Sequence, residues 1–299
     1  MTAERKITFH IVDVFAEEPL AGNPLTVVPD ADPLPESAMK RIAREFNQSE
    51  TTFILQPTRP GAAFRLRSFT PAGFEVHGAG HNALGAWWWL AESGRIGPLG
   101  QGVRAAQELG DAVLDVEVQA ADGALAMIGL TQGRPMAQAV HPDTAAVARA
   151  LGIGPNHLVA DPLPQVVSTG VSHLLVQAVG RAAVNRAQPD SEALRRELAS
   201  VAAQGCYLFH AGSESPDAHA YARFFNPSVG IWEDPATGSA AGPLAWLLAR
   251  RGHVPWQTHV VIEQGHQVGR PSRLVAHVAP DRVHLLGRCM TVGSGTLHY

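Results

Sequence analysis

The sequence predicts an α+β fold made of two similarly built domains. Short alternating strand patterns outnumber helical ones along the chain, and one succession of strand, proline turn, glycine-rich loop and helix occurs twice. The composition suits a globular protein, because 299 residues that are 45% hydrophobic, with a mean hydropathy of −0.01, can bury one large core or two ordinary ones.

The first half of the chain combines alternating apolar segments with two helical ones. A strand is expected where apolar and polar residues alternate, and a helix where apolar residues recur every three or four positions after a proline or before a glycine. Strands are predicted at 6–15, 25–28, 51–55, 62–69 and in short pieces within 103–130, and helices at 35–46 and 82–94.

The second half shows the same signals. Asp190 is a suitable N-cap for one of its helices, and Gly252 ends another. Helices are predicted at 143–152, 190–204 and 240–252, and strands at 172–179, 205–211, 219–225, 258–264, 273–279, 282–287 and 290–293.

An internal repeat links the two halves. The pattern R-x-F-[T/N]-P occurs at 67–71 and again 156 residues later at 223–227. Each copy is followed by a glycine-rich loop and a helix, with Gly80-His81 in the first and Gly238-Ser239 in the second, and GNPLTVV at 22–28 has a looser counterpart in GVSHLLV at 170–176. The repeat predicts a domain over 1–130 and a second over 131–280.

Charge and cysteine content exclude several classes of protein. A net charge of −4 and a pI near 6.4 do not favour nucleic acid or an anionic membrane as a partner. The first fifteen residues lack an apolar segment of signal-peptide length and Trp87–Leu90 is too short to span a bilayer, so a cytoplasmic protein is expected. Cys206 and Cys289 are expected to be inert, buried thiols.

The repeated loop and helix predict an anion site. The first turn of a helix has unpaired N–H groups and the positive end of the helix dipole, so it can bind a carboxylate or phosphate. If two such helix ends face one cleft, they suit a small substrate that carries a carboxylate. His81 and Ser239 would then point into this cleft, and Asp234 could join them.

Other interpretations of these residues remain open from the local sequence. GAGHNALG is not a G-x-G-x-x-G fingerprint, which disfavours a nucleotide site. His77 and His81 are four residues apart, but the glycines between them argue against a helix and no third ligand is suggested, so no metal is expected. Asp234 precedes a proline and could be a turn residue.

Glu50 stands immediately before the strand 51–55, in the stretch FNQSETTF. A carboxylate at the mouth of an apolar strand is either a solvated strand-end residue or a general acid/base in a partly dry site. Burial against apolar neighbours such as Phe53 would raise its pKa towards the working pH. The local stretch does not decide between these two roles.

Six motifs together resemble the PhzF family. They are D-V-F-x(6)-G-N-P (13–24), N-Q-S-E-T-T-F (47–53), F-T-P-x(8)-G-H (69–81), T-G-x-x-H-L-L-V (169–176), E-D-P-A-T-G-S-A (233–240) and E-Q-G-x(3)-G-R-P-S (263–272). The resemblance implies the diaminopimelate-epimerase-like fold, with two pseudo-symmetric domains that each wrap a curved, mainly antiparallel β-sheet or barrel around a central helix. It implies an active site in the cleft between the domains, a return of the last strands, about 281–299, to the first domain, and a homodimer.

The resemblance also implies the chemistry: isomerisation by cofactor-independent proton transfer, as in the trans-2,3-dihydro-3-hydroxyanthranilate isomerases of the family. The family's catalytic glutamate falls on Glu50, and its cleft histidine, aspartate and serine fall on His81, Asp234 and Ser239. Neighbouring residues of the same motifs are expected to bind substrate: Asn23, Ser49, Gly80, Asn82, Thr237, Gly238 and Gly265.

Two alternative functions stay open. Related epimerases use a pair of cysteines as opposed acid/base groups, but the corresponding positions here resemble Ala79 and Ala236, which disfavours a two-thiol racemase. An amino-acid racemase or epimerase with other groups remains possible, as does a non-catalytic protein that binds small acids. A single glutamate can both remove and return a proton if the two carbons lie within its reach, and this favours the isomerase.

Overall fold

The chain divides into two compact units. The computed structural model describes residues 6–299; the first unit contains the residues up to Leu130 together with Leu286–Tyr299, and the second contains Thr131–Leu285. The sequence predicts a boundary after residue 130 and a returning segment from about residue 281. That each unit folds as a domain stays a prediction.

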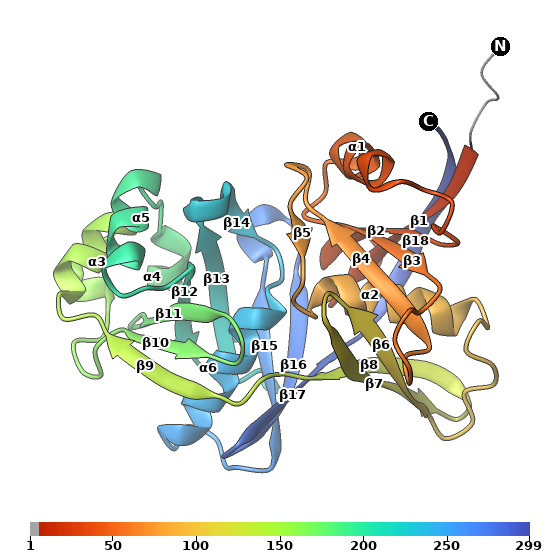
Figure 1. The fold of residues 1–299 in the computed structure, drawn as a ribbon. Helices are drawn as coiled ribbons and strands as arrows, with labels where there is room; N and C mark the ends of the chain where they lie inside the picture. Colours follow the sequence, from red (N-terminus) through yellow and green to blue (C-terminus); the bar gives the residue numbers. More distant parts are fainter. Residues whose placement is uncertain (1–5) are drawn as a thin grey trace. The chain divides into compact units, whose positions relative to one another are not determined.

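From residue 6 onwards, the first unit consists mainly of strands and contains two helices, α1 and α2 (Figure 1). Its elements are β1 Lys6–Val14, β2 Asn23–Val28, α1 Glu36–Phe46, β3 Thr51–Leu55, β4 Phe64–Phe69, β5 Glu75–Val76, α2 His81–Glu92, β6 Val103–Leu109, β7 Ala112–Ala121, β8 Ala124–Thr131 and β18 Cys289–His298.

The second unit has the same succession with two further short helices. Its elements are β9 Met136–Val140, α3 Thr144–Ala150, β10 Gln165–Ser168, β11 Ser172–Gln177, α4 Arg181–Arg186, α5 Ser191–Ser200, β12 Gly205–Ala211, β13 Ala220–Asn226, β14 Ile231–Asp234, α6 Gly238–Arg250, β15 Thr258–Gln264, β16 Ser272–Ala279 and β17 Arg282–Gly287. Single 3₁₀ turns occupy Pro155–His157, Pro227–Val229 and His266–Val268.

Strand pairing repeats from unit to unit. In the first unit β1–β2 and β3–β4 are antiparallel, β2–β3 and β4–β6 are parallel, and β6–β7 is antiparallel. In the second unit β10–β11 and β12–β13 are antiparallel, β11–β12 and β13–β15 are parallel, and β15–β16 is antiparallel. The internal repeat that the sequence predicts is therefore a repeat of topology.

The last strand of each repeat is exchanged. β9 follows β8 in the chain but pairs with β10, the first strand of the second repeat. β18 ends the second repeat but pairs along its whole length with β1, from Lys6 opposite His298 to Val14 opposite Cys289. Figure 1 shows this pair as a red and a blue strand lying side by side.

Each unit has one helix that is buried on all sides. In α2, Asn82–Ala91 are buried, and the helix packs against β1, β2, β3, β7 and β18. In α6, Gly238 and Ala240–Ala249 are buried, and the helix packs against β10, β11, β15 and β16. A helix that is apolar all round has no solvent face, so strands of its own unit must cover it.

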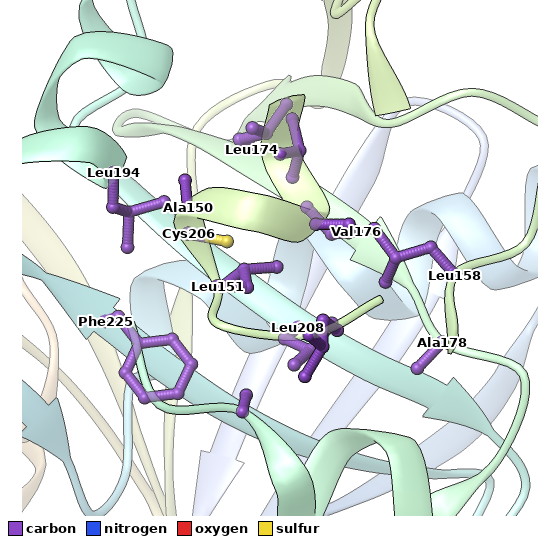
Figure 2. Close-up of a cluster of buried hydrophobic side chains, with 14 of the residues drawn as sticks. Ala150, Leu151, Leu158, Leu174, Val176, Ala178, Leu194, Cys206, Leu208 and Phe225 are labelled. Atoms are coloured by element: carbon purple, nitrogen blue, oxygen red, sulfur yellow. The ribbon is translucent and has the colours of Figure 1, made fainter. Parts of the chain in front are cut away.

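The remaining helices cover separate cores. In the first unit, α1 places Met39 and Ile42 against Phe53 and Phe69 of β3 and β4. In the second, α3, α4 and α5 cover a cluster in which the Cys206 sulfur lies among aliphatic side chains (Figure 2). Burial raises the pKa of Cys206 to about 12 and raises that of Cys289 as well, so both thiols stay protonated.

The R-x-F motif forms the same ion pair in both units. Arg67 binds Glu75 through Nε (2.7 Å) and Nη2 (2.6 Å), joining β4 to β5. Arg223 binds Glu233 through Nε (2.9 Å) and Nη2 (2.7 Å), joining β13 to β14. Bidentate pairing fixes the direction in which the chain leaves the sheet, and the glycine-rich loop follows directly.

A second polar contact also repeats. Glu108 on β6 accepts from the Thr58 hydroxyl at 2.7 Å, and Glu263 on β15 accepts from the Ser213 and Ser215 hydroxyls. Burial alone would raise the pKa of both carboxyls, but the hydrogen bonds lower it below the ordinary value. Each of these acids is thus held ionised and anchors the loop after β3 or β12.

The structure departs from the predicted elements in a few places. α4 is absent from the sequence prediction, because its six residues are too few to show a helical period. The short strands β5, β9, β10 and β14 are absent from it as well. α6 begins at Gly238 rather than at residue 240, and α2 at His81 rather than 82, so Ser239 and His81 both belong to the first helical turn. None of the helices in residues 6–299 is long and apolar enough to cross a membrane.

The two ion pairs should differ in their contribution to stability. Glu233→Gln is expected to lower the free energy of unfolding by about 3 kcal/mol, since it leaves the Arg223 guanidinium buried beside a neutral group. Glu75→Gln should cost about 1 kcal/mol, because Arg67 and Glu75 are 15% and 23% exposed against 7% and 4% for Arg223 and Glu233. Urea denaturation followed by tryptophan fluorescence measures both; equal losses would contradict this ranking.

Candidate active site

In the first unit, the catalytic candidates Glu50 and His81 lie next to each other. Glu50 immediately precedes β3, and the first four residues of this strand are buried. His81 is the first residue of α2. Their side chains are 17% and 11% exposed, and His81 Nδ1 lies 3.9 Å from Glu50 Oε2. The strand end and the helix start thus bring together two titratable groups that are 31 positions apart in the sequence.

His81 is neutral at physiological pH. Burial lowers its pKa from 6.5 to about 4. Its Nε2 is buried and has no hydrogen-bond partner among residues 6–299. At 3.9 Å the contact with Glu50 is too long for a hydrogen bond, and the neutral ring forms no ion pair, so the imidazole is able to accept or donate one hydrogen bond to a bound molecule.

Asn82 organises the loop before α2. Its Oδ1 accepts from the Gly80 N–H at 2.8 Å, and its Nδ2 donates to Gly78 O at 3.0 Å and Ser68 Oγ at 3.2 Å. The side chain is buried and its amide is used inside the protein. The substrate-binding role predicted for Gly80 and Asn82 stays a prediction; the structure gives Asn82 the task of holding the loop.

Asn23 and Ser49 lie close to Glu50. Ser49 Oγ donates to Asn23 Oδ1 at 3.5 Å, and the neighbouring Gln48 accepts from the Thr26 hydroxyl at 2.9 Å. Asn23 is fully buried at the start of β2, which pairs in parallel with β3. These bonds tie the segment that carries Glu50 to the neighbouring strand.

The second unit places Asp234, Thr237, Gly238 and Ser239 around the start of α6. Asp234 ends β14, Thr237 is the N-cap residue, and the next two residues begin the helix. The Thr237 hydroxyl donates to Asp234 Oδ2. The aspartate is 7% exposed and its carboxylate is oriented by a neighbour three residues on, as at a turn before a helix.

Gln264 holds this loop from the adjacent strand β15. Its Nε2 donates to Asp234 O at 2.7 Å and to Thr237 Oγ1 at 3.1 Å, and its Oε1 accepts from the Tyr207 hydroxyl at 2.7 Å. Burial, and secondarily the charge of Asp234, raises the pKa of Tyr207 well above 10, so the phenol remains a donor. Gln264 was not predicted as a functional residue, although it lies in the E-Q-G motif.

Gly265 is required by a close approach of chain segments. Its φ is +82°, and a Cβ there would lie 2.2 Å from Arg270 O and 2.5 Å from Pro235 O. The glycine therefore lets the loop after β15 pack against the loop that carries Asp234. Its predicted contact with substrate stays a prediction.

Ser239 has a partner that the sequence analysis missed. His173 on β11 places Nε2 at 3.1 Å from Ser239 Oγ, and its ring packs edge to face against Phe224 at 5.0 Å. Burial lowers the pKa of His173 to about 3, so it is neutral. Its place in the T-G-x-x-H motif was the signal that could have identified it.

The second unit has no glutamate at the position equivalent to Glu50. Thr51 on β3 pairs with Phe69 on β4, and Cys206 on β12 pairs with Phe225 on β13, so Thr51 and Cys206 are equivalent positions. The residue that precedes them is Glu50 in the first unit and Gly205 in the second. A Cβ at Gly205 would lie 2.4 Å from the Phe224 ring. The aromatic ring occupies the space that any side chain at this position would need.

The candidate residues thus form two groups, one in each unit. Glu50, His81, Asn23, Ser49, Gly80 and Asn82 belong to the first, and Asp234, Thr237, Gly238, Ser239 and Gly265 to the second. In residues 6–299, no cluster of three or more His, Cys, Asp or Glu side chains is arranged to hold a metal ion.

The chain matches known proteins over nearly its whole length. A family model described as phenazine biosynthesis-like protein, PhzC-PhzF, matches residues 12–295. The trans-2,3-dihydro-3-hydroxyanthranilate isomerase of Pseudomonas chlororaphis is 35% identical over 292 residues, which cover 96% of this chain and 98% of that protein.

Solved structures agree with this match. A PhzF-family phenazine biosynthesis protein of Bacillus anthracis has a TM-score of 0.90 at 24% identity, over 98% of this chain and 99% of that one. A hydroxyproline epimerase of Agrobacterium vitis has a TM-score of 0.68 at 14% identity, over 100% of this chain and 94% of that one. The predicted fold class, α+β and diaminopimelate-epimerase-like, is confirmed.

The low pKa of His81 should make stability depend on pH. Because the folded protein binds this proton more weakly than the unfolded chain, the stabilisation is complete above pH 6.5 and is lost as the pH falls towards 4. As the pH falls from 6.5 to 4, the free energy of unfolding of the wild type should therefore decrease relative to that of His81→Asn. The C2–H resonance of His81 should titrate near pH 4; a midpoint at or above 6.5 would show that the ring is not desolvated.

Proposed function

Because the chain belongs to the PhzC-PhzF family of phenazine biosynthesis-like proteins and is an isomerase, we propose that it moves a proton between two carbons of a small carboxylate-bearing substrate without a cofactor. The relative from Pseudomonas chlororaphis bears the name of such a reaction, the isomerisation of trans-2,3-dihydro-3-hydroxyanthranilate. The proposed substrate class is a small cyclic or acyclic acid with an acidic C–H bond.

The observation that carries the proposal is the single glutamate at the repeated strand start. Glu50 is largely buried beside a neutral histidine, and the corresponding position in the second unit is Gly205, where the Phe224 ring excludes a side chain. One carboxylate held at one edge of the site suits a reaction in which the same group removes the proton and returns it.

In the proposed reaction the Glu50 carboxylate accepts a proton from one carbon. The electron pair of the broken C–H bond enters the conjugated system of the substrate, and the double bonds shift. The protonated Glu50 then gives the same proton to a second carbon, which restores the carboxylate and leaves substrate and product as isomers. Only 17% of the Glu50 side chain is exposed, so few water molecules compete with the substrate for its carboxylate.

The helix starts supply the proposed binding groups. Backbone N–H groups in the first turns of α2 and α6 favour a carboxylate or the negative charge that develops during proton transfer. The hydroxyl of Ser239 and the imidazole of His81 lie in those same turns, and Asp234 stands four residues before α6. We propose that Glu50 and His81 act on the migrating proton and that Ser239 binds the carboxylate of the substrate.

An amino-acid racemase is the weaker alternative. Racemisation through two bases needs acid/base groups on opposite sides of one carbon, and the positions that resemble the epimerase cysteines are Ala79 and Ala236. Ala236 is buried, and the neighbouring Asp234 carboxylate accepts the Thr237 hydroxyl. Chiral analysis after incubation with a panel of amino acids tests this alternative directly.

Glu50→Gln is the decisive variant, because it keeps the size and shape of the side chain but cannot carry a proton. We expect it to lower kcat by at least about 10³-fold with little change in substrate Kd, since the shuttle acts in the chemical step. The substrate is first found by screening small amino and hydroxy acids in heavy water and following exchange at carbon by NMR.

Glu45→Gln is the matched control. Glu45 is exposed on α1, so this change removes one solvent-facing carboxylate and should leave kcat unchanged. Turnover by Glu50→Gln within about tenfold of wild type would contradict the shuttle role. Saturable binding of an acid with neither exchange nor turnover in the wild type would favour a non-catalytic binding protein.

A further inference from the structure

His173 contacts Ser239, a residue of the proposed site, from the buried interior of the second unit. It is the second residue of β11 and only 2% exposed, and its Nε2 lies 3.1 Å from the Ser239 hydroxyl in the first turn of α6. Ser239 is partly exposed, whereas the imidazole is enclosed by the unit. His173 therefore acts on any bound molecule through the serine, if it acts at all.

We propose that His173 is a positioning residue that donates its Nε2–H to Ser239 Oγ and so directs the serine hydroxyl to donate to an acceptor oxygen of the substrate. A hydroxyl oxygen that accepts from the ring turns its own hydrogen away from the ring. The inference rests on the proposed function, which it deepens by specifying the substrate group at Ser239 as an unprotonated oxygen, such as a carboxylate.

The direction of this hydrogen bond follows from the other ring nitrogen. His173 Nδ1 is buried and has no hydrogen-bond partner among the residues that the structure describes. The ring is neutral, because burial lowers its pKa to about 3, so it carries one N–H. A proton on Nδ1 would leave a buried donor unpaired, whereas a proton on Nε2 pairs the donor and leaves only an acceptor unpaired, which proteins tolerate better.

The packing around His173 keeps the ring in place. Phe224 lies edge to face against it, with ring centroids 5.0 Å apart and an interplanar angle of 89°. Phe224 has room because Gly205 has no side chain. The residue of the first unit that is equivalent to His173 is Leu25. Leu25 precedes Thr26, which pairs with Thr51 of β3. In the same way, His173 precedes Leu174, which pairs with Cys206 of β12.

The two units therefore use equivalent positions differently. The first has an acid, Glu50, before its strand β3 and an aliphatic residue, Leu25, packed against Gly85 of α2. In the second, Gly205 leaves room for the Phe224 ring, which packs edge to face against His173, and His173 in turn contacts the Ser239 hydroxyl. This supports a division of tasks in which one unit supplies the proton-transferring group and the other a rigid donor for the substrate's oxygen.

The tautomer can be read directly. Long-range ¹H–¹⁵N NMR of ¹⁵N-histidine-labelled protein, with His173→Gln for assignment, should show His173 as the Nε2–H form and unchanged between pH 8 and 5. The measurement uses the unliganded full chain and does not depend on a substrate. Observation of the Nδ1–H form would overturn the proposal, because the serine would then donate to the ring and not to a ligand.

Binding of anthranilate, a small planar carboxylate that lacks an acidic C–H bond and serves as an unreactive probe, tests the coupling to Ser239. By calorimetry, Ser239→Ala and His173→Leu should each weaken binding about tenfold, as expected for one hydrogen bond to a charged group. The double variant should bind no more than about twofold more weakly than Ser239→Ala, and His173→Gln, which places an amide N–H near the position of Nε2, should bind within about threefold of wild type.

The outcomes separate a positioning role from a structural one. If the losses of His173→Leu and Ser239→Ala multiply in the double variant, or if His173→Gln binds as weakly as His173→Leu, His173 does not act through the serine and the proposal is overturned. Failure of the proposed function shows elsewhere: Glu50→Gln would then retain turnover, with the tautomer and the coupling between His173 and Ser239 unaffected.

Discussion

In each unit, the arginine–glutamate pair is the interaction on which the path from strand to central helix depends. In each unit a buried strand must connect to a helix that is buried on all sides, and the connecting loop has to leave the sheet in a defined direction. Arg67 with Glu75 and Arg223 with Glu233 each fasten the short strand after the turn to the long strand before it. The glycine-rich loop and the first helical turn then follow within a few residues, so the pair determines where His81 or Ser239 lies.

Buried polar side chains complete the support of each helix start. Asn82 satisfies the loop before α2, and Gln264 satisfies the loop before α6 through Asp234 and Thr237. Loops that carry unpaired backbone groups into a protein interior are costly unless every group finds a partner. Asn82 and Gln264 supply partners for several groups of these loops, while the N–H groups of the first helical turn point out of the end of the helix, where an anion can be bound.

The same topology has been adapted to two different purposes. Glu50 and Gly205 occupy equivalent positions in the strand register of the two units. Only Glu50 has a side chain, because the Phe224 ring fills the corresponding space in the second unit. Burial gives both histidines beside the helix starts a pKa far below 6.5, so neither competes with Glu50 as a base of ordinary strength or as a cation. The asymmetry is chemical, while the backbone plan is shared.

Local patterns in the sequence were sufficient for much of this. Apolar runs and apolar alternation located most of the strands, and 205–211, 258–264 and 282–287 agree residue for residue with the structure. The strands β5, β9, β10 and β14 were not predicted. The R-x-F-[T/N]-P motif and the glycine-rich loops revealed the repeat, and Asp190 was correctly expected to cap α5, since capping depends on three neighbouring residues. Glu50, His81, Asp234 and Ser239 were named from motifs alone, and their roles remain proposals.

Only the tertiary structure decided which side chains meet. The approach of His81 to Glu50, the contact of His173 with Ser239 and the support of Asp234 by Gln264 join residues that are 30 to 66 positions apart. The exchange of β9 and β18 was likewise invisible in composition and spacing, because a strand's own pattern shows which face is buried but not which strand lies beside it. Burial, and with it the low pKa of both histidines, follows from those long-range contacts and not from the local sequence.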